Sequence, residues 1–290
     1  MTIFQKTAIF FLHFCLVVLF FVCSSFSPLG SGINKSPSFA PLEDFGSVPC
    51  LNKKVSIIAY IVKDSLGVPP PPPDPANIEQ QILDAIDSAN KDFSPICLSF
   101  KVCEFVYIDN YQYDLMDTLP NADTVDDVKS VIELYYKPNV INMYFVSNYV
   151  PSDPDECGQS YMPPSAQNPD TLDFIAIGKQ CFPAPAKAIS HALGHFFGLY
   201  HTFANPGSEL ADGSNCAIAG DSLCDTPADP KGTADGSCNY TGPFLDPNGV
   251  FYFPPIDNIM SYYKDCRCRF TREQYLRMAQ QYLASRTYLW

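Results

Sequence analysis

The residues of this sequence best suited to chemistry are three closely spaced histidines, His191, His195 and His201. We expect residues 186–199 to form a helix, on which His191 and His195 project from the same face because they lie four positions apart. Two imidazoles at that spacing are typical ligands of zinc, which binds such nitrogens at about 2.0–2.1 Å. Gly198 allows the helix to end and the chain to turn back, so that His201 can become a third ligand. Three neutral histidines leave a fourth coordination position open, as in catalytic zinc sites.

Several motifs in and after this run resemble those of a known family. The pattern HxxxHxxGxxH, continued as Leu-Tyr-His-Thr-Phe, resembles the zinc signature of the pappalysin group of metzincin metallopeptidases. A Gly-Asp…Asp-Thr-Pro element at 220–227 and a Met-turn, Asn-Ile-Met-Ser-Tyr, at 258–262 follow in the family's order. A Cys…Phe-Thr…Gln…Arg-Met stretch at 266–278 completes a resemblance that covers about residues 186–280.

The resemblance implies a fold and a set of roles. The expected fold is an α/β (α+β) metzincin-like catalytic domain, in which a twisted mixed sheet backed by helices precedes an irregular, disulfide-stapled C-terminal part. Peptides would bind in the cleft between the two parts. The resemblance assigns His191, His195 and His201 to zinc and places Met260 beneath the metal as a packing base. It makes Tyr262 an additional zinc ligand or a donor to the transition state.

A second metal site is implied in the C-terminal part. Asp221, Asp225 and Thr226 resemble part of a calcium site in such proteins. Carboxylates in a loop rich in glycine and aspartate suit Ca²⁺ on general grounds as well. The alternative is a solvated loop with an Asx turn at Asp225.

One position departs from the family's pattern in a way that bears on function. The family's motif has glutamate directly after the first histidine, where this chain has Ala192. That glutamate takes a proton from zinc-bound water and passes it to the leaving amine, which is worth about 10²–10⁴-fold in rate. Alanine can do neither, so we predict a zinc-binding pseudopeptidase with weak or no cleavage. Two alternatives stay open: a working zinc endopeptidase with another base, and a non-enzymatic, disulfide-rich binding module.

The elements that position the histidines fit one α/β or α+β domain over about residues 50–290. Thr271 is expected to cap the last helix, with Gln274 completing a capping box. Residues 202–257 show no clear period, and their cysteines and acids can hold the chain through disulfides and a hard cation. Strands are expected over 55–62, 98–108, 140–146 and 173–177, and helices over 76–92, 124–136, 186–199 and 271–285.

The start of the chain has the pattern of a secretion signal. Lys6 precedes an apolar run over 7–22, and small residues follow it. We therefore predict a signal peptide over 1–24, a flexible leader over 25–49, and a secreted, periplasmic or extracellular location. The alternatives are a retained N-terminal anchor and a lipid on Cys23 after cleavage. No other apolar stretch reaches the length of a membrane span, so none is expected in the mature chain.

The net charge indicates which classes of partner are not expected, and the number of cysteines indicates the redox compartment. The chain has 18 Lys and Arg against 31 Asp and Glu, a net charge of −13. Nucleic acids and anionic membranes require a basic face, so neither is an expected partner. Removing Cys15 and Cys23 with the signal peptide reduces twelve cysteines to ten, an even number that indicates disulfides formed in an oxidising compartment. The family resemblance implies that Cys238 pairs with Cys266 or Cys268.

Overall fold

The computed structural model of the chain describes residues 47–64, 77–117, 134–146, 148–150, 157–160, 162, 173–178, 187–205 and 207–289. The predicted signal peptide and the predicted leader up to residue 46 lie outside these ranges, as does most of the helix predicted over 124–136. Within the described ranges, no helix is both long enough and apolar enough to cross a membrane.

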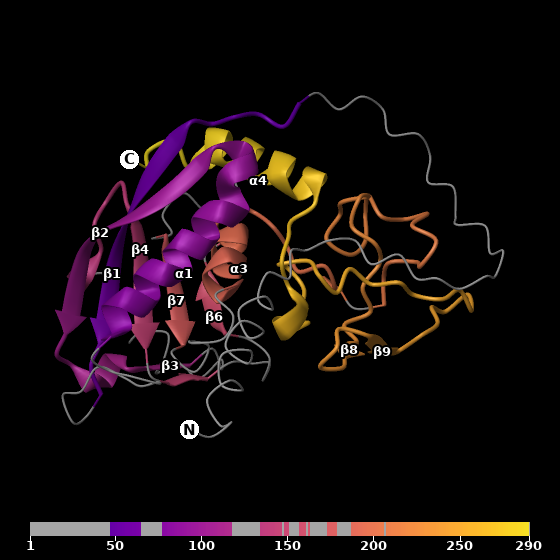
Figure 1. The fold of residues 1–290 in the computed structure, drawn as a ribbon, viewed down its shortest axis with the longest axis horizontal. Helices are drawn as coiled ribbons and strands as arrows, with labels where there is room; N and C mark the ends of the chain where they lie inside the picture. Colours follow the sequence, from indigo (N-terminus) through magenta and orange to yellow (C-terminus); the bar gives the residue numbers. More distant parts are fainter. Residues whose placement is uncertain are drawn as a thin grey trace, which may run out of the picture. The chain divides into compact units, whose positions relative to one another are not determined.

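A mostly parallel sheet of five strands, in the order β2-β1-β4-β7-β6, forms the first part of the described fold (Figure 1). All neighbouring strands run parallel except β6 and β7, which are antiparallel. β6 is the last strand in this order and therefore lies at an edge of the sheet. Long apolar, β-branched runs suit strands buried on both faces of such a sheet, and the four strands predicted from the sequence are confirmed. The strands are β1 (Lys53–Val62), β2 (Leu98–Ile108), β4 (Ile141–Val146), β6 (Gly158–Ser160) and β7 (Phe174–Gly178).

Helices pack on the sheet and bury the larger of its two apolar clusters. α1 (Ile78–Phe93) lies across the sheet with α3 (Lys187–Phe196) beside it, and α4 (Arg272–Ser285) contributes to the same core (Figure 1). Ile82 and Ile86 are buried on α1 at the four-residue spacing of an amphipathic helix. The mixed α/β fold class expected from the sequence is therefore confirmed.

α4 begins with the capping box that the sequence predicts. Thr271 Oγ1 accepts a hydrogen bond from Gln274 N at 3.3 Å, and Gln274 Oε1 accepts one from Thr271 N at 2.9 Å. The Gln274 amide also exchanges hydrogen bonds of 3.0 and 3.2 Å with the side chain of Asn258. The start of α4 is thereby fixed to the turn that contains Met260.

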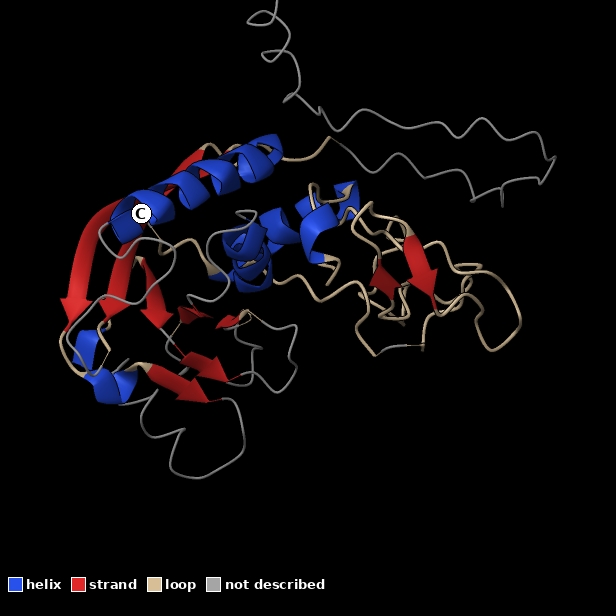
Figure 2. Ribbon diagram, turned by 60° about the horizontal axis from the view of Figure 1, so that its bottom comes forward, coloured by secondary structure: helices blue, strands red, loops and turns tan. Residues whose placement is uncertain are grey.

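The chain from 197 to 271 is mostly irregular and is drawn mainly as loop in Figure 2. It contains an antiparallel ribbon of β8 (Thr233–Ala234) and β9 (Tyr240–Gly242). Strands of two and three residues are too short to produce a sequence period, which is why residues 202–257 show none. Short elements complete the described fold: the parallel pair β3 (Leu115–Asp117) and β5 (Asn148–Val150), and 3₁₀ turns at Ser94–Ile96, Tyr111–Tyr113 and Lys264–Cys266.

Disulfides hold both parts of the described chain. Cys50 is bonded to Cys97 beside the sheet, and Cys216 is bonded to Cys224 in the irregular part. Of the two partners expected for Cys238, the structure has Cys266. This bond joins the β8–β9 ribbon to the segment that follows the Met-turn.

Candidate metal centre

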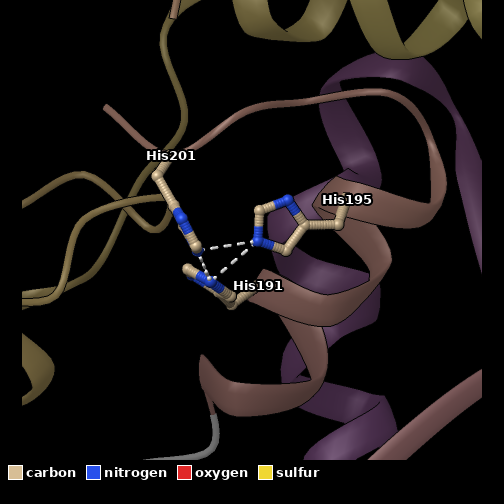
Figure 3. Close-up of side chains that lie close together, drawn as sticks. All are labelled: His191, His195 and His201. Carbon is tan, nitrogen blue, oxygen red and sulfur yellow. Dashed lines mark hydrogen bonds between the residues drawn. The ribbon is translucent and has the colours of Figure 1, made fainter. Parts of the chain in front are cut away.

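Three imidazole nitrogens converge on one point (Figure 3). The Nε2 atom of His191 lies 3.1 Å from that of His195 and 3.1 Å from that of His201, and the last two atoms are 2.9 Å apart. Nitrogens bound to tetrahedral zinc at about 2.0–2.1 Å lie about 3.3 Å from one another, so the cluster is close to the size that one ion requires. Among the residues that the structure describes, no other three His, Cys, Asp or Glu side chains bring their ligand atoms within 4.8 Å of one another.

The turn after α3 returns the third histidine to the helix. α3 ends at Phe196, before the predicted end at 199, because Gly198 adopts a φ of +88° that side chains disfavour. Gly198 N donates to His195 O at 2.8 Å and closes the helix end. Thr202 N then donates to Met260 O at 3.2 Å, which fixes the returning segment against the Met-turn.

The outer ring nitrogens of the helical histidines are held by main-chain carbonyls. His191 Nδ1 lies 2.7 Å from Ile259 O, and His195 Nδ1 lies 2.7 Å from Leu199 O. Because a carbonyl oxygen only accepts, each Nδ1 carries the proton and each Nε2 presents a lone pair. The contact between these two Nε2 atoms therefore joins two acceptors and is not a hydrogen bond. Two lone pairs facing each other fit a shared cation.

Burial keeps these imidazoles neutral. It lowers the pKa of His195 to about 4. Burial, with smaller effects from His195, Lys231 and Arg267, lowers the pKa of His201 to about 2. Burial and its histidine neighbours also hold the pKa of His191 well below its ordinary value. Neutral imidazole is the form that binds a metal, so the site needs to release no proton at pH 7.

Met260 packs against α3 between the two helical histidines. A Cβ atom added at Gly194 would lie 2.5 Å from Met260 Sδ, so the methionine fits only because position 194 has no side chain. Met260 is fully buried, and its amide donates to Asn258 Oδ1 at 2.8 Å. The structure thus packs the Met260 side chain directly against α3 at Gly194.

A cavity of about 260 Å³ opens beside the histidines, with Ala192 and Tyr262 in its wall. The ring centroid of Tyr262 lies 4.7 Å from that of His201. None of the described residues that line this cavity is an aspartate or a glutamate. The lining also includes Ser160 and Arg267, which the sequence did not single out because neither belongs to a recognisable motif.

The residues of the predicted calcium site are more buried than a solvated loop would allow. Asp221 and Thr226 are 1% and 2% exposed. Asp221 Oδ2, Asp225 Oδ1 and Thr226 Oγ1 have no hydrogen-bond partner in the described structure. Glu209, which the sequence analysis missed, is buried too, and neither of its carboxylate oxygens has such a partner. Only its place in an acid-rich loop could have indicated it.

Asp229 is a further residue that no sequence motif indicates. Its carboxylate is buried and accepts hydrogen bonds from Thr202 Oγ1 at 2.6 Å, Tyr263 OH at 2.9 Å and Lys231 N at 3.0 Å. Thr202 follows His201 in the chain, and Tyr263 follows Tyr262. Asp229 therefore joins the segment of the third histidine to the Met-turn.

Asp229→Ala is expected to lower the free energy of unfolding by about 2–4 kcal/mol, because several donors lose their acceptor and each unpaired buried group costs about 1–3 kcal/mol. Chemical denaturation measures this change. Asp109→Ala is the matched control, since Asp109 is exposed and pairs with Lys63 at 3.4 Å; there we expect a loss of about 0–1 kcal/mol. Equal losses in the two variants would contradict the joining role of Asp229.

Comparisons with known proteins are consistent with this geometry. The sequence model of the pregnancy-associated plasma protein-A family, Peptidase M43, matches residues 140–283. An extracellular metalloprotease of Arthroderma otae is 26% identical over 220 residues, which are 72% of each chain. One of Colletotrichum graminicola is 27% identical over 214 residues, 69% of this chain and 67% of that protein. One of Pyricularia oryzae is 32% identical over 151 residues, 49% of this chain and 48% of that protein.

Proposed function

Because the chain belongs to the pregnancy-associated plasma protein-A (Peptidase M43) family, we propose that it is a secreted zinc-binding protein that holds peptides and cleaves them weakly or not at all. One observation carries the proposal: a full set of three neutral histidines adjoins Ala192 in a cavity whose described lining has no carboxylate. Such a site has the donors that a metal needs, and its described lining lacks a carboxylate that could act as the base of hydrolysis.

Zinc is the metal that suits this donor set. Three imidazoles, two of them oriented by carbonyl groups on their outer nitrogens, are typical zinc ligands. Zinc, when bound, polarises a peptide carbonyl and lowers the pKa of water. His191, His195 and His201 are already directed at one point, so binding requires little rearrangement.

The proposed loss of catalysis follows from the lack of a proton acceptor at position 192. The methyl group of Ala192 cannot accept a proton, and Arg267 is a cation. The ring of Tyr262 packs against that of His201 with centroids 4.7 Å apart, and we propose its hydroxyl as an additional ligand or as a donor to a developing oxyanion. The described lining of the cavity offers Tyr262 no carboxylate to act with, so we expect peptides to be retained rather than cut.

β6 supplies a place for a peptide beside the histidines. It is the last strand of the described sheet, and Gly158 and Ser160 line the cavity. Ser160 Oγ donates to Ala192 O at 2.7 Å, which fixes this strand to α3. An extended peptide can add to such an edge through main-chain hydrogen bonds.

Two measurements on the purified mature chain test this function. We expect about one zinc per chain by elemental analysis, and little cleavage of an unfolded protein substrate. Absence of zinc would contradict the metal site and favour the binding module with structural histidines. Cleavage at rates typical of metallopeptidases would favour the working enzyme, which the names of the relatives also favour.

Calcium is the proposed ion for the acidic loop. Glu209, Asp221, Asp225 and Thr226 contribute five unpartnered oxygen atoms, and oxygen is the donor that Ca²⁺ requires. Burial, with the charges of Asp221 and Asp229, raises the pKa of Glu209 to about 8. Burial likewise raises the pKa of Asp221 to about 7. A bound cation would offset the free-energy cost of burying these carboxylates in their charged form.

The stabilising effect of calcium is expected to grow as the pH rises from 5 to 8. Glu209 and Asp221 have folded pKa values of about 8 and 7, above the unfolded values of about 4. Without a cation, their contribution to stability is therefore complete only at low pH and is lost as the pH rises through 7 to 8. Calcium binds the deprotonated carboxylates, so the increase in the protein's Tm that calcium produces should appear over the same pH interval.

Thermal unfolding at both pH values, with zinc constant and calcium varied, measures this effect. Glu209→Gln should reduce both the pH dependence and the response to calcium. Asp212→Asn is the matched control, because Asp212 is an exposed acid of the same loop. A calcium response that Glu209→Gln leaves unchanged would count against this site.

Secretion is proposed from the predicted signal peptide over 1–24 and from relatives named as extracellular. A flexible leader over 25–49 and a single domain over 50–290 complete the proposed organisation. A retained anchor or a lipid on Cys23 would instead keep the domain at a membrane surface. Sequencing the N-terminus of the secreted chain distinguishes these outcomes.

A further inference from the structure

We infer that the side-chain amide of Asn239 carries an N-linked oligosaccharide when the chain is exported through a eukaryotic secretory pathway. The inference rests on the proposed secretion, and it is independent of the metal and of peptide cleavage. It adds a modification site to the turn between β8 and β9.

Asn239 begins a motif that the proposed function does not use. The sequence Asn239-Tyr240-Thr241 has the pattern of an acceptor site, Asn-x-Ser/Thr with x other than proline. The pattern occurs twice in the chain, and the other copy, Asn34-Lys35-Ser36, lies in the predicted leader outside the described residues. A motif of three residues also arises by chance, so exposure and local geometry have to decide whether Asn239 is a usable acceptor.

The acceptor lies on an open part of the surface. Asn239 and Thr241 are both exposed. A Cβ atom added at Gly236, in the same turn, would meet no atom within 4 Å beyond its own chain neighbours. N-linked sugars are bulky and belong on such a surface.

The turn holds Asn239 through contacts that a sugar leaves in place. Asp235 Oδ1 accepts hydrogen bonds of 2.9 Å from the backbone amides of Ser237 and Asn239. Asn239 Nδ2 lies 3.0 Å from Asp235 Oδ2 and 3.2 Å from Asp235 Oδ1. The side-chain amide has two hydrogens, and a sugar replaces one of them. The remaining hydrogen can still donate to the Asp235 carboxylate, so the folded turn accommodates the modified side chain.

The transfer is a substitution at a sugar carbon, and the host supplies the co-reactant. Asn239 Nδ2 forms a bond to the anomeric carbon of an oligosaccharide carried on a polyisoprenoid diphosphate. The bond from that carbon to the phosphate oxygen breaks, the lipid diphosphate leaves, and the amide loses one proton. No atom is oxidised or reduced, and the host's transferase catalyses the step.

The hydrogen bonds of Thr241 indicate when the transfer takes place. In the folded ribbon, Thr241 Oγ1 donates to Thr233 O at 2.9 Å and lies 2.6 Å from Thr233 Oγ1. The motif requires a hydroxyl at this position. We therefore expect the sugar to be attached before β8 and β9 pair.

Peptide mass spectrometry of the full chain, secreted from a eukaryotic host, tests the inference. We expect the peptide that contains Asn239 to carry an oligosaccharide in most molecules. Treatment with a peptide N-glycosidase, which hydrolyses the bond between the amide and the sugar, should leave aspartate at position 239. A peptide that is unmodified in most secreted molecules overturns the inference.

Variants assign the modification to this motif. Thr241→Ala should abolish it, and Thr241→Ser should retain it because serine keeps the hydroxyl. Asn248→Gln is the matched control, since Asn248 is an exposed asparagine of the next turn and is followed by Gly249 and Val250, outside any such motif. Thermal unfolding of each secreted variant excludes misfolding as the cause. A sugar that persists at Asn239 in Thr241→Ala contradicts the assignment.

The culture medium separates this inference from the proposed secretion. A full chain that is not exported contradicts the predicted signal peptide. In that case residues 25–290 behind the host's own signal peptide decide the inference by the same mass measurement. Zinc content and cleavage, measured on the same samples, test the proposed metal site separately from the sugar.

Discussion

Replacing Ala192 with glutamate is expected to raise cleavage of an unfolded protein substrate by about 10²–10⁴-fold, the usual contribution of general acid–base catalysis. The new carboxylate would enter the cavity next to His191, where the described lining has none. Alanine and glutamate are both good helix formers, so α3 should form equally well in the variant. Release of fluorescent fragments from a labelled, unfolded substrate measures the rate, with zinc and calcium present.

Ala192→Gln is the control for this variant, because glutamine has the size of glutamate and cannot act as the base. It should remain as inactive as the parent. If both variants stay inactive while their zinc content is normal, a group besides the base is also missing. If the parent already cuts at the rate of Ala192→Glu, another residue supplies the proton transfer and the chain is a working peptidase.

His195→Ala is expected to lower zinc affinity by at least about 100-fold, since loss of a residue that merely orients a ligand already costs about 10–100-fold. His195 contributes one of the three converging nitrogens, and its Nε2 lies 2.9 Å from that of His201. Competition with a chromophoric chelator measures the affinity, and elemental analysis gives the stoichiometry.

Tyr200→Ala is the matched control for the histidine variant. Tyr200 lines the same cavity and precedes His201, yet its side chain is half exposed. Its removal should leave the zinc stoichiometry unchanged. Zinc retained at full affinity by His195→Ala would show that the ion binds elsewhere, and would favour the reading of the histidines as structural.

The parts of the fold that the sequence predicts are those with local signals. β1 and β2 follow from apolar, β-branched runs, and α4 follows from an amphipathic period with a capping box at Thr271 and Gln274. The convergence of the histidines is also local, because a helix spacing of four and a glycine turn bring them together within eleven residues. Predicting such features does not require knowing which segments far apart in the sequence come into contact.

The parts that the sequence does not predict depend on contacts between distant residues. The choice of Cys266 over Cys268 as the partner of Cys238 is made by the path of the loop, and the two are only two positions apart. Asp229 joins Thr202 to Tyr263, which lie 27 residues before it and 34 after it. Arg267 lines the cavity only because the fold brings it to the histidine cluster, and no motif in the sequence around it indicates this position.

The bond between Cys238 and Cys266 has a practical consequence for producing the protein. It fixes the β8–β9 ribbon to the segment that carries Arg267 and follows Tyr262, both of which line the cavity. A host cytoplasm that keeps thiols reduced would not form this bond. In protein made there, the missing disulfide alone could abolish binding of both metal and peptide. Every comparison of Ala192 variants should therefore use protein that its host has exported and oxidised.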